Sequence, residues 1–338
     1  MSTKIAVLGL GEIGKTVLAQ LSQNPQVDAH GFDITNGHDL SNVSVIEQCL
    51  SGMDAVIATT PYFLNLKIAE VAARFEIVYF DVTEDVDTSN AIKNMNANMP
   101  MISQCGLAPG MVSIIANNLA KTFDKVRDIK IRVGALPQLP TNHMKYNFTW
   151  STIGLINEYS NPCRELENGK IGWKSPLSGL EQLTIAGMPL EAARTSGGIG
   201  TLADSWKGKA ENVNYKTIRY PKHFDYMKFL IDDLKMHKDK ETFRKIFDST
   251  VPRIKNDMIL ILIIVNGEKD KKFMEESYTK IIMPDLGLSA IQLSTVFGLM
   301  SVVDTWLDGN IKASGLITQE SLDFNLISKS TYSQIYLN

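Results

Sequence analysis

A glycine-rich turn near the N-terminus constrains the fold of this chain more than any other stretch. An apolar run at residues 4–8 leads into Gly9, Gly11 and Gly14, which match the G-x-G-x-x-G spacing. The spacing alone is weak evidence, because ordinary loops also carry glycines at these intervals. The context strengthens it, since the run before the turn has the character of a buried strand and apolar residues recur at helical spacing after it. This order of strand, turn and helix predicts a dinucleotide-binding unit, with the pyrophosphate at the helix N-terminus.

An acidic residue follows the turn where ribose recognition requires one. The second predicted strand, residues 27–32, ends at Asp33, about 20 residues beyond the turn, where an acid commonly accepts hydrogen bonds from the adenosine ribose. Residues 34–36 offer no Lys or Arg to a 2′-phosphate, so the sequence favours NAD over NADP. A turn without a ligand is the alternative, and Asp39 could equally cap a helix or lie beside the adenine. The residues expected to bind the cofactor are Gly9, Gly11, Glu12, Ile13, Gly14, Asp33, Asp39, Leu40, Thr59, Thr60 and Pro61.

Strands and helices alternate through the first third of the chain. Further strands are predicted at 54–60, 77–82 and 101–105, with helical segments between them. This alternation predicts an α/β fold whose first domain, residues 1–122, is a Rossmann-type, doubly wound parallel sheet of about six strands.

The pattern changes from residue 126 onward. Candidate strands lie at 129–133, 146–150, 181–185 and 259–265. The segment between 133 and 146 is too short for a crossover helix, which indicates that the first two strands pair in antiparallel fashion. We therefore expect a second, mixed α/β substrate and dimerisation domain over residues 123–288. The lysine-rich stretch 223–246 is typical of a solvated helical face. Residues 289–338, with an apolar helix at 290–307, are expected to pack on the first domain or to form a subunit interface.

Composition narrows the classes of partner. The chain has 338 residues, of which 44% are hydrophobic and 21% charged, and its net charge is −3, which gives no reason to expect nucleic acid or an anionic membrane. Cys49, Cys105 and Cys163 are odd in number and widely spaced, so neither a disulfide framework nor a metal site is expected. The absence of a secretory signal pattern and the unpaired cysteines favour a cytoplasmic location.

Several downstream segments carry a resemblance that periodicity does not show. They are Cys105–Gly110 (CGLAPG), residues 150–159, Thr195–Gly198 (TSGG) and Tyr215–Pro221 (YKTIRYP). With the glycine turn, they make the chain similar to the saccharopine dehydrogenase superfamily, in particular its lysine 6-dehydrogenase-like members. The resemblance implies NAD(P)-linked oxidation of an amine to an imine on an amino-acid substrate, or the reverse reduction, by an oligomer that we expect to be a dimer. Saccharopine-forming reductases carry Asp in a GLDPG loop where this chain has Ala108, so saccharopine itself is disfavoured.

The chemistry needs a group for the substrate carboxylate and a group for one proton, because the cofactor performs hydride transfer. Arg219 offers a planar fork for the carboxylate and Lys216 a point charge beside it, although a structural ion pair is the alternative for Arg219. For the proton we favour His223, whose ordinary pKa is about 6.5, over His143 and Asp81. The predicted catalytic residues are His223, Lys216, Arg219, Tyr62, Asp81 and Tyr215, with Glu158 as a supporting acid, Thr195–Gly198 as a flexible turn and Cys105 as packing.

The leading hypothesis is an NAD-dependent amine dehydrogenase or imine reductase that acts on an amino acid such as lysine. One alternative is a saccharopine- or carboxynorspermidine-type reductase, which joins an amine to a carbonyl compound. The other is a non-catalytic NAD-binding regulator, because Ala108 leaves a catalytic position of a related branch unfilled.

Overall fold

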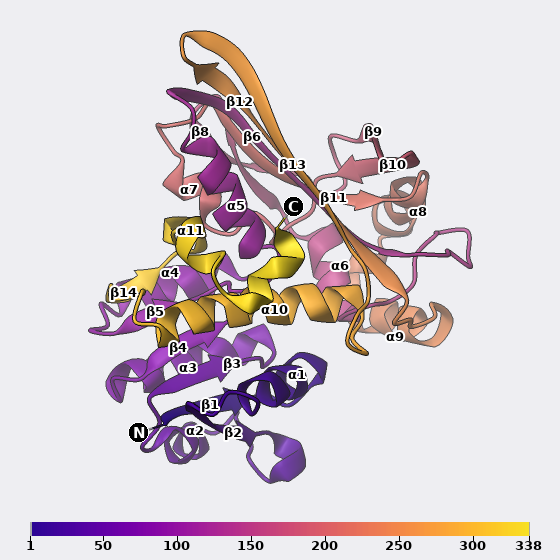
Figure 1. Cartoon of the computed structure of the whole chain (residues 1–338). Helices are drawn as coiled ribbons and strands as arrows, with labels where there is room; N and C mark the ends of the chain where they lie inside the picture. The colour runs from indigo at the N-terminus through magenta and orange to yellow at the C-terminus, as the bar shows by residue number, and fades with distance from the viewer. Residues whose placement is uncertain (1, 338) are drawn as a thin grey trace. The chain divides into compact units, whose positions relative to one another are not determined.

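The computed structural model describes residues 2–337, which form two compact units (Figure 1). Unit 1 holds the chain up to Ile114 together with Thr295–Leu337, and unit 2 holds Ile115–Ser294. Each unit has its own sheet, so each is described by itself.

Unit 1 is built on a parallel sheet of six strands in the order β14-β5-β4-β3-β1-β2. The strands are β1 (Thr3–Leu8), β2 (Val27–Phe32), β3 (Ala55–Ala58), β4 (Val78–Asp81), β5 (Pro100–Ile102) and β14 (Gly315–Ile317). All of their pairings are parallel. The predicted Rossmann-type sheet is therefore confirmed, but its sixth strand, β14, comes from the C-terminal segment, where no strand was predicted.

The helices of unit 1 follow the strands as the alternation predicts. They are α1 (Glu12–Leu21), α2 (Val43–Leu50), α3 (Tyr62–Arg74) and α4 (Val86–Asn94), with a 3-10 turn η1 at Ile34–Asn36. Strand β3 is buried at every residue, as expected for a parallel strand covered on both faces. The C-terminal segment adds η4 (Gln319–Ser321), α11 (Phe324–Ile327) and η5 (Thr331–Tyr336).

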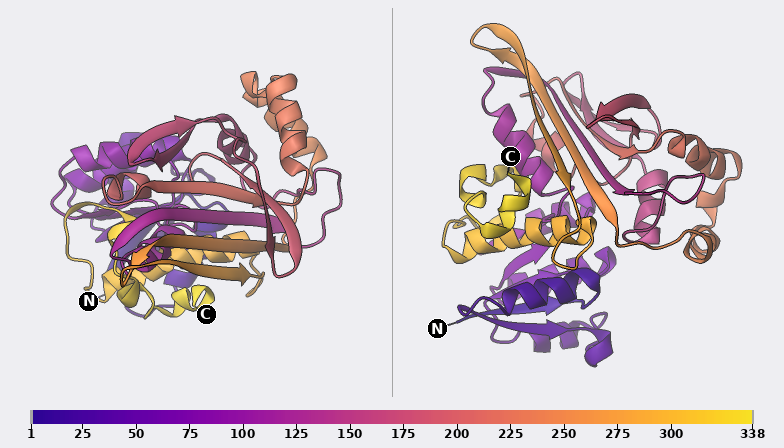
Figure 2. Two further views of the ribbon diagram at one scale, coloured as in Figure 1. Left: turned by 90° about the horizontal axis from the view of Figure 1, so that it is seen from above. Right: turned by 45° about the vertical axis from the view of Figure 1, so that its right-hand side comes forward.

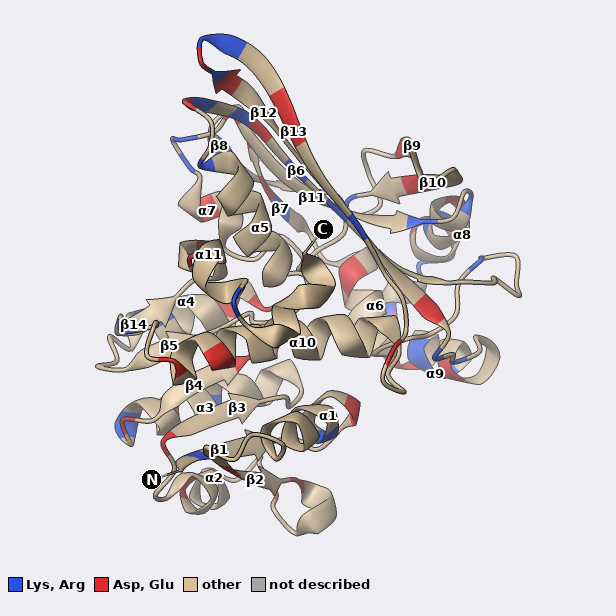
Figure 3. Ribbon diagram, viewed as in Figure 1, with Lys and Arg blue, Asp and Glu red and all other residues tan. Residues whose placement is uncertain are grey.

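Unit 2 contains a mixed sheet with the principal order β13-β12-β6-β11-β10-β9 (Figure 2). Its strands are β6 (Lys125–Pro137), β7 (Cys163–Glu167), β8 (Lys170–Lys174), β9 (Glu181–Ile185), β10 (Met188–Ala193), β11 (Asn212–Arg219), β12 (Asp257–Lys269) and β13 (Lys272–Ile282). Strands β6 and β11 are parallel, whereas the other pairs are antiparallel. The second domain is thus mixed, as expected. Charges of both signs are interspersed along its strands (Figure 3), in keeping with a net charge of −3.

One prediction about local structure in unit 2 is wrong, and a second is made more detailed. Residues 146–150 form no strand, because Tyr146 and Phe148 turn into an aromatic core cluster and only Phe148 makes an isolated bridge, to Arg253. The stretch 223–246 is helical, as predicted, but it is divided into several short elements. It comprises α8 (His223–Lys228), a π-helical turn at Phe229–Asp233, a 3-10 turn at Met236–Lys238 and α9 (Lys240–Thr250). Lys235, between them, has a left-handed φ of 56° that interrupts helical geometry.

The remaining helices are α5 (Met111–Ala120), α6 (Thr152–Ser160), α7 (Leu202–Ser205) and α10 (Ala290–Leu307). Helix α10 begins and ends where the apolar pattern predicts. It is long and apolar enough to cross a membrane by length and composition, but 72% of it is buried inside the protein, as in a core helix.

Candidate functional site

The glycine turn of unit 1 lies where the strand order of its sheet reverses. From β1 the chain moves first to β2 on one side and then to β3 on the other, so a crevice is expected beyond the carboxyl ends of β1 and β3. The turn after β1 and the segment Thr59–Pro61 after β3 meet there, since Thr59 Oγ1 donates to Gly9 O at 2.6 Å. The same threonine's N–H donates to Leu8 O at 2.9 Å.

Each of the three glycines meets a different physical requirement. Gly9 has a φ of +92°, a conformation that L side chains rarely adopt. A Cβ on Gly14 would lie 1.8 Å from Gly9 O and 2.5 Å from Thr59 Oγ1, so the start of α1 packs against the turn only without a side chain. A Cβ on Gly11 would meet nothing within 4 Å. The open space at Gly11 and the uncapped N-terminus of α1 fit a pyrophosphate that approaches the backbone closely.

Asp33 joins the end of β2 to this turn. Its Oδ2 accepts from Leu10 N–H at 2.8 Å, and its Oδ1 accepts from the N–H and the hydroxyl of Thr35 at 2.9 and 2.8 Å. The hydrogen bonds from Thr35 and Leu10 lower the pKa of Asp33, so the group is ionised at neutral pH. A carboxylate offers about four acceptor positions, and three are used here, which leaves room for one ribose hydroxyl.

The other predicted cofactor residues differ in how well their side chains can reach a ligand. Thr60 Oγ1 donates to Asn65 Oδ1 at 2.7 Å and so orders the start of α3. Asp39 accepts from Ser41 N–H at 3.0 Å in a local turn before α2, whose N-cap is Asn42, so the alternative that Asp39 caps the helix is wrong. Leu40 exposes only 5% of its surface and packs in the core, so its side chain is not placed beside an adenine. Tyr62, which follows Pro61, is 53% exposed and packs edge-to-face against Phe63, so it is free to touch a ligand.

Asp81 is a buried structural carboxylate in this geometry, not a proton carrier. It has no exposed surface and accepts hydrogen bonds from the Tyr79 hydroxyl, the Ser103 hydroxyl and the N–H groups of Thr83 and Gln104. Burial raises its pKa, while these hydrogen bonds oppose the rise. The carboxylate therefore joins the carboxyl ends of β4 and β5.

The Cys105–Gly110 loop follows β5 and closes on itself. Gly106 bridges to Gly110, whose φ is +133° and whose added Cβ would lie 2.0 Å from Gly106 O. Cys105 is 1% exposed, and burial raises the pKa of its thiol well above the ordinary value, so it acts as packing.

Unit 2 places Arg219 in a closed aromatic and polar cluster. The side chain is 2% exposed, and its Nε donates to Tyr159 Oη at 2.7 Å. Its guanidinium carbon lies 5.1 Å from the ring centre of Tyr146 and 5.7 Å from that of Tyr159. Its Nη2 lies 3.8 Å from Glu158 Oε2, which is too long for a hydrogen bond.

Glu158 has a larger role in this cluster than the sequence indicated. Its Oε1 accepts from the Thr217 hydroxyl at 3.3 Å, whereas its Oε2 is buried without a hydrogen-bond partner among the described residues. Burial raises the pKa of Glu158 to about 7, and the charge of Arg219 opposes the rise. The group thus changes protonation state near neutral pH.

His223 belongs to the same cluster, but both of its ring nitrogens are engaged. Nδ1 lies 2.9 Å from Met144 O and must carry the proton, because a carbonyl only accepts. Nε2 then accepts from the Tyr159 hydroxyl at 3.0 Å. Burial and the Arg219 charge lower the pKa of His223 to about 3, so the ring is neutral and has no spare position for a substrate proton. We therefore assign His223 to the orientation of Tyr159, and not to proton transfer.

Lys216 does not lie beside Arg219. Side chains alternate between the faces of a strand, so positions three apart on β11 point to opposite faces. Lys216 Nζ donates instead to Gly179 O at 2.6 Å and Glu181 Oε2 at 2.7 Å, and Arg132 pairs with the same Glu181. Sequence spacing could have excluded the Lys216–Arg219 pairing, because both residues belong to one strand.

The other candidates in unit 2 are placed as follows. Tyr215 shares the face of Arg219, and the Thr195–Gly198 turn packs on its ring, since a Cβ on Gly198 would lie 2.3 Å from Tyr215 Cζ. Thr195 and Thr217 are joined through their hydroxyls at 2.6 Å. His143 lies in an exposed turn.

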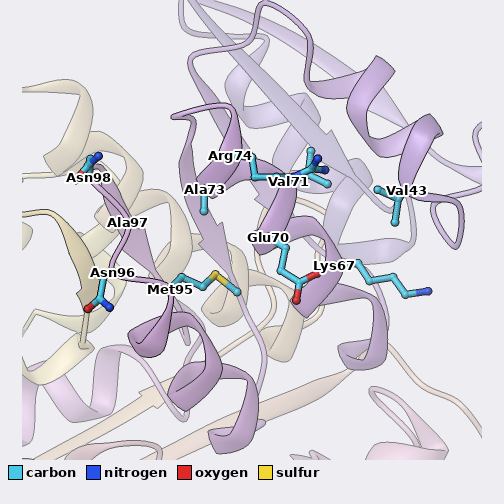
Figure 4. Close-up of a pocket in the computed structure, with 10 residues that line it drawn as sticks. All are labelled: Val43, Lys67, Glu70, Val71, Ala73, Arg74, Met95, Asn96, Ala97 and Asn98. Atoms are coloured by element: carbon cyan, nitrogen blue, oxygen red, sulfur yellow. The ribbon is translucent and has the colours of Figure 1, made fainter.

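An open hollow of about 700 Å³ lies elsewhere in unit 1, between α2, α3 and the segment that precedes β5 (Figure 4). Its charged lining residues are Lys67, Glu70 and Arg74, and Arg74 is paired with Glu47 at 2.6 Å. It contains none of the predicted site residues. Residues 2–337 contain no group of three or more His, Cys, Asp or Glu arranged to hold a metal ion.

Comparison with known proteins identifies the family to which the sequence is similar. Residues 106–332 match the family model for the saccharopine dehydrogenase C-terminal domain. The mitochondrial alpha-aminoadipic semialdehyde synthase of Rattus norvegicus is 26% identical over 200 residues, which cover 51% of this chain and 21% of the rat protein. The saccharopine dehydrogenase (NADP(+), L-glutamate-forming) of Saccharomyces cerevisiae is 23% identical over 200 residues, which cover 51% of this chain and 44% of the yeast protein. The match thus spans less than half the length of either relative.

Solved structures show the same fold at low sequence identity. Apo saccharopine dehydrogenase (L-Glu forming) from Saccharomyces cerevisiae superposes with a TM-score of 0.79 at 16% identity, covering 97% of this chain and 96% of that one. The homospermidine synthase of Legionella pneumophila, determined in complex with NAD, superposes with a TM-score of 0.65 at 13% identity, covering 100% of this chain and 90% of that one.

Proposed function

The chain belongs to the saccharopine dehydrogenase family, and from this premise we propose that it is an NAD-dependent oxidoreductase acting on the CH–NH group of an amino acid. The observation that carries the proposal is the glycine turn, whose three glycines and Asp33 form a cradle suited to a dinucleotide. When bound, the nicotinamide cofactor supplies the hydride chemistry.

The preference for NAD rests on the charge beside the turn. Asp33 is ionised and would repel a 2′-phosphate, and its unused acceptor position suits a ribose hydroxyl. The yeast relative is named for NADP(+), so the choice of cofactor is a specific point on which this chain is proposed to differ.

Unit 2 supplies groups that match an amino-acid substrate. Arg219 Nη2 and Glu158 Oε2 lie 3.8 Å apart, and Glu158 Oε2 is buried without a hydrogen-bond partner among the described residues, so the cluster offers a guanidinium and a spare acceptor. A carboxylate complements the guanidinium, and an ammonium complements the glutamate. We propose that this pair recognises the amino-acid end of the substrate, which must enter a cluster that is closed in this structure. With an ordinary pKa of 4.5 raised to about 7, Glu158 is also suited to accept the amine proton.

The test is turnover by purified protein. NAD is mixed with a panel of amino acids, including lysine, and absorbance is recorded at the NADH band. Oxidation of at least one amino acid supports the proposal, whereas absence of both turnover and NAD(H) binding refutes it. Consumption of NADH only when an amine and a carbonyl compound are both present would favour the alternative reductase, which the fold shared with saccharopine dehydrogenase supports. NADH binding without any turnover would favour a regulator.

A further inference from the structure

Two buried side-chain amides in unit 1, beside the Cys105–Gly110 loop, each have one polar atom without a hydrogen-bond partner among the described residues. They are Gln104 Nε2 and Gln319 Oε1, and neither has a partner among residues 2–337. The two side chains expose only 2% and 1% of their surface. Buried polar groups are normally paired, so a spare donor and a spare acceptor on neighbouring segments require an explanation.

The two amides lie at the ligand-binding edge of the parallel sheet. Strands β5 and β14 are neighbours, with Ile102 opposite Ile317, so Gln104 and Gln319 each follow their strand's last paired residue by two positions. Both therefore lie beyond the carboxyl ends of the strands, on the edge that also carries the glycine turn after β1. Gln319 Nε2 donates to Ser103 O at 2.8 Å and to Cys105 Sγ at 3.2 Å, which places it across the backbone on both sides of Gln104.

The backbone of Gln104 is also held in an unusual conformation. Its φ is 67°, in the left-handed region, although it is not a glycine. Two hydrogen bonds fix this conformation: Gln104 N–H donates to Asp81 Oδ1 and Cys105 N–H donates to Asp81 O, both at 2.8 Å. Such strained residues persist where the surroundings hold them, and they cluster at ligand-binding positions. The buried Asp81 network therefore fixes the backbone at Gln104.

We propose that Gln104 and Gln319 recognise the carboxamide group of the nicotinamide ring. Gln104 donates to the carboxamide oxygen, and Gln319 Oε1 accepts from the carboxamide nitrogen. A primary amide has one acceptor oxygen and a donor nitrogen, so it complements one spare donor and one spare acceptor. Rotation of the Gln104 amide by a half-turn exchanges its nitrogen and oxygen at almost the same positions, so its donor can be oriented towards the ligand. Because both atoms are shielded in this structure, the proposal requires a local movement of the side chains. The inference rests on the proposed function, because it takes a nicotinamide dinucleotide as the cofactor.

The test compares ligands that differ only at the nicotinamide. Dissociation constants for NAD and for ADP-ribose, which lacks the ring, are measured by calorimetry for the wild type, Gln104→Leu, Gln319→Leu and the exposed control Gln23→Leu. We expect each of the first two variants to bind NAD about three- to tenfold more weakly, the effect of one lost hydrogen bond, while ADP-ribose affinity and the control stay unchanged.

A second measurement needs no substitution in the protein. In 3-acetylpyridine adenine dinucleotide a methyl group replaces the carboxamide nitrogen, so the wild type should bind it more weakly than NAD, and Gln319→Leu should lose that preference. Equal wild-type affinity for the two dinucleotides, or an equal loss of NAD and ADP-ribose in the variants, overturns the inference and leaves the proposed function standing. Wild-type protein that binds neither NAD nor ADP-ribose refutes both.

Discussion

The substitution Gly11→Ala separates a ligand effect from a folding effect. The added Cβ would meet nothing within 4 Å, and the backbone at Gly11, with φ −70° and ψ −166°, is an extended conformation that alanine adopts readily. The free energy of unfolding without ligand should therefore change by less than about 0.5 kcal/mol. If a pyrophosphate approaches this backbone, the methyl group displaces it, and NAD affinity should fall by at least about tenfold, or 1.4 kcal/mol.

The assay combines chemical denaturation without ligand with NAD titration by calorimetry. Gly172→Ala is the matched control, because its Cβ also meets nothing within 4 Å and it lies on β8, away from the glycine turn. Gly14→Ala gives the opposite signature, since its Cβ would lie 1.8 Å from Gly9 O and overpacking of this kind destabilises by about 1–3 kcal/mol. A Gly11→Ala protein with wild-type NAD affinity would refute the assignment of the turn as the phosphate site.

Three further substitutions test the charged groups. Asp33→Ala should lower the affinity for NAD by about tenfold and the affinity for NADP by less, because only the free ribose hydroxyl of NAD loses a hydrogen bond to the carboxylate. Unchanged cofactor preference in competitive titrations would contradict this. The pKa of Glu158 is raised from 4.5 to about 7 in the folded protein, so the protonated side chain contributes to the free energy of unfolding. This contribution is fully present below pH 4.5 and is lost as the pH rises through 7. Denaturation between pH 4.5 and 8 should therefore show a decline that Glu158→Gln removes, and parallel profiles would count against the assignment. Asp81→Asn should lower the free energy of unfolding by about 1–3 kcal/mol, because the NH₂ group that replaces one carboxylate oxygen would face hydrogen-bond donors. Loss of turnover at unchanged stability would instead support Asp81 as a proton carrier.

The first sheet was predictable from the sequence because its signals are local. A buried strand, the glycine turn and a helix with periodic apolar residues all lie within about 30 residues of one another. Each strand and helix carries its own apolar pattern. The strand β14 escaped prediction because it has three residues and pairs with β5, more than 200 positions earlier in the chain. A segment that short has too few residues to show alternation, and only the tertiary pairing makes it a strand. For the same reason Gln319 was absent from the candidate residues.

The predicted catalytic group depended on contacts that sequence distance conceals. Arg219 and Lys216 were joined because they are close in the sequence, yet strand alternation sends them to opposite faces, and Lys216 pairs with Glu181. The acidic residue that approaches Arg219 is Glu158, 61 positions away on α6, and burial raises the pKa of Glu158. His223 was attractive for its ordinary pKa, and the same burial removes that advantage by lowering its pKa to about 3. Residue type alone therefore favoured His223, whereas the proposal that Glu158 accepts the proton rests on burial beside a cation with a spare oxygen, which only the fold reveals.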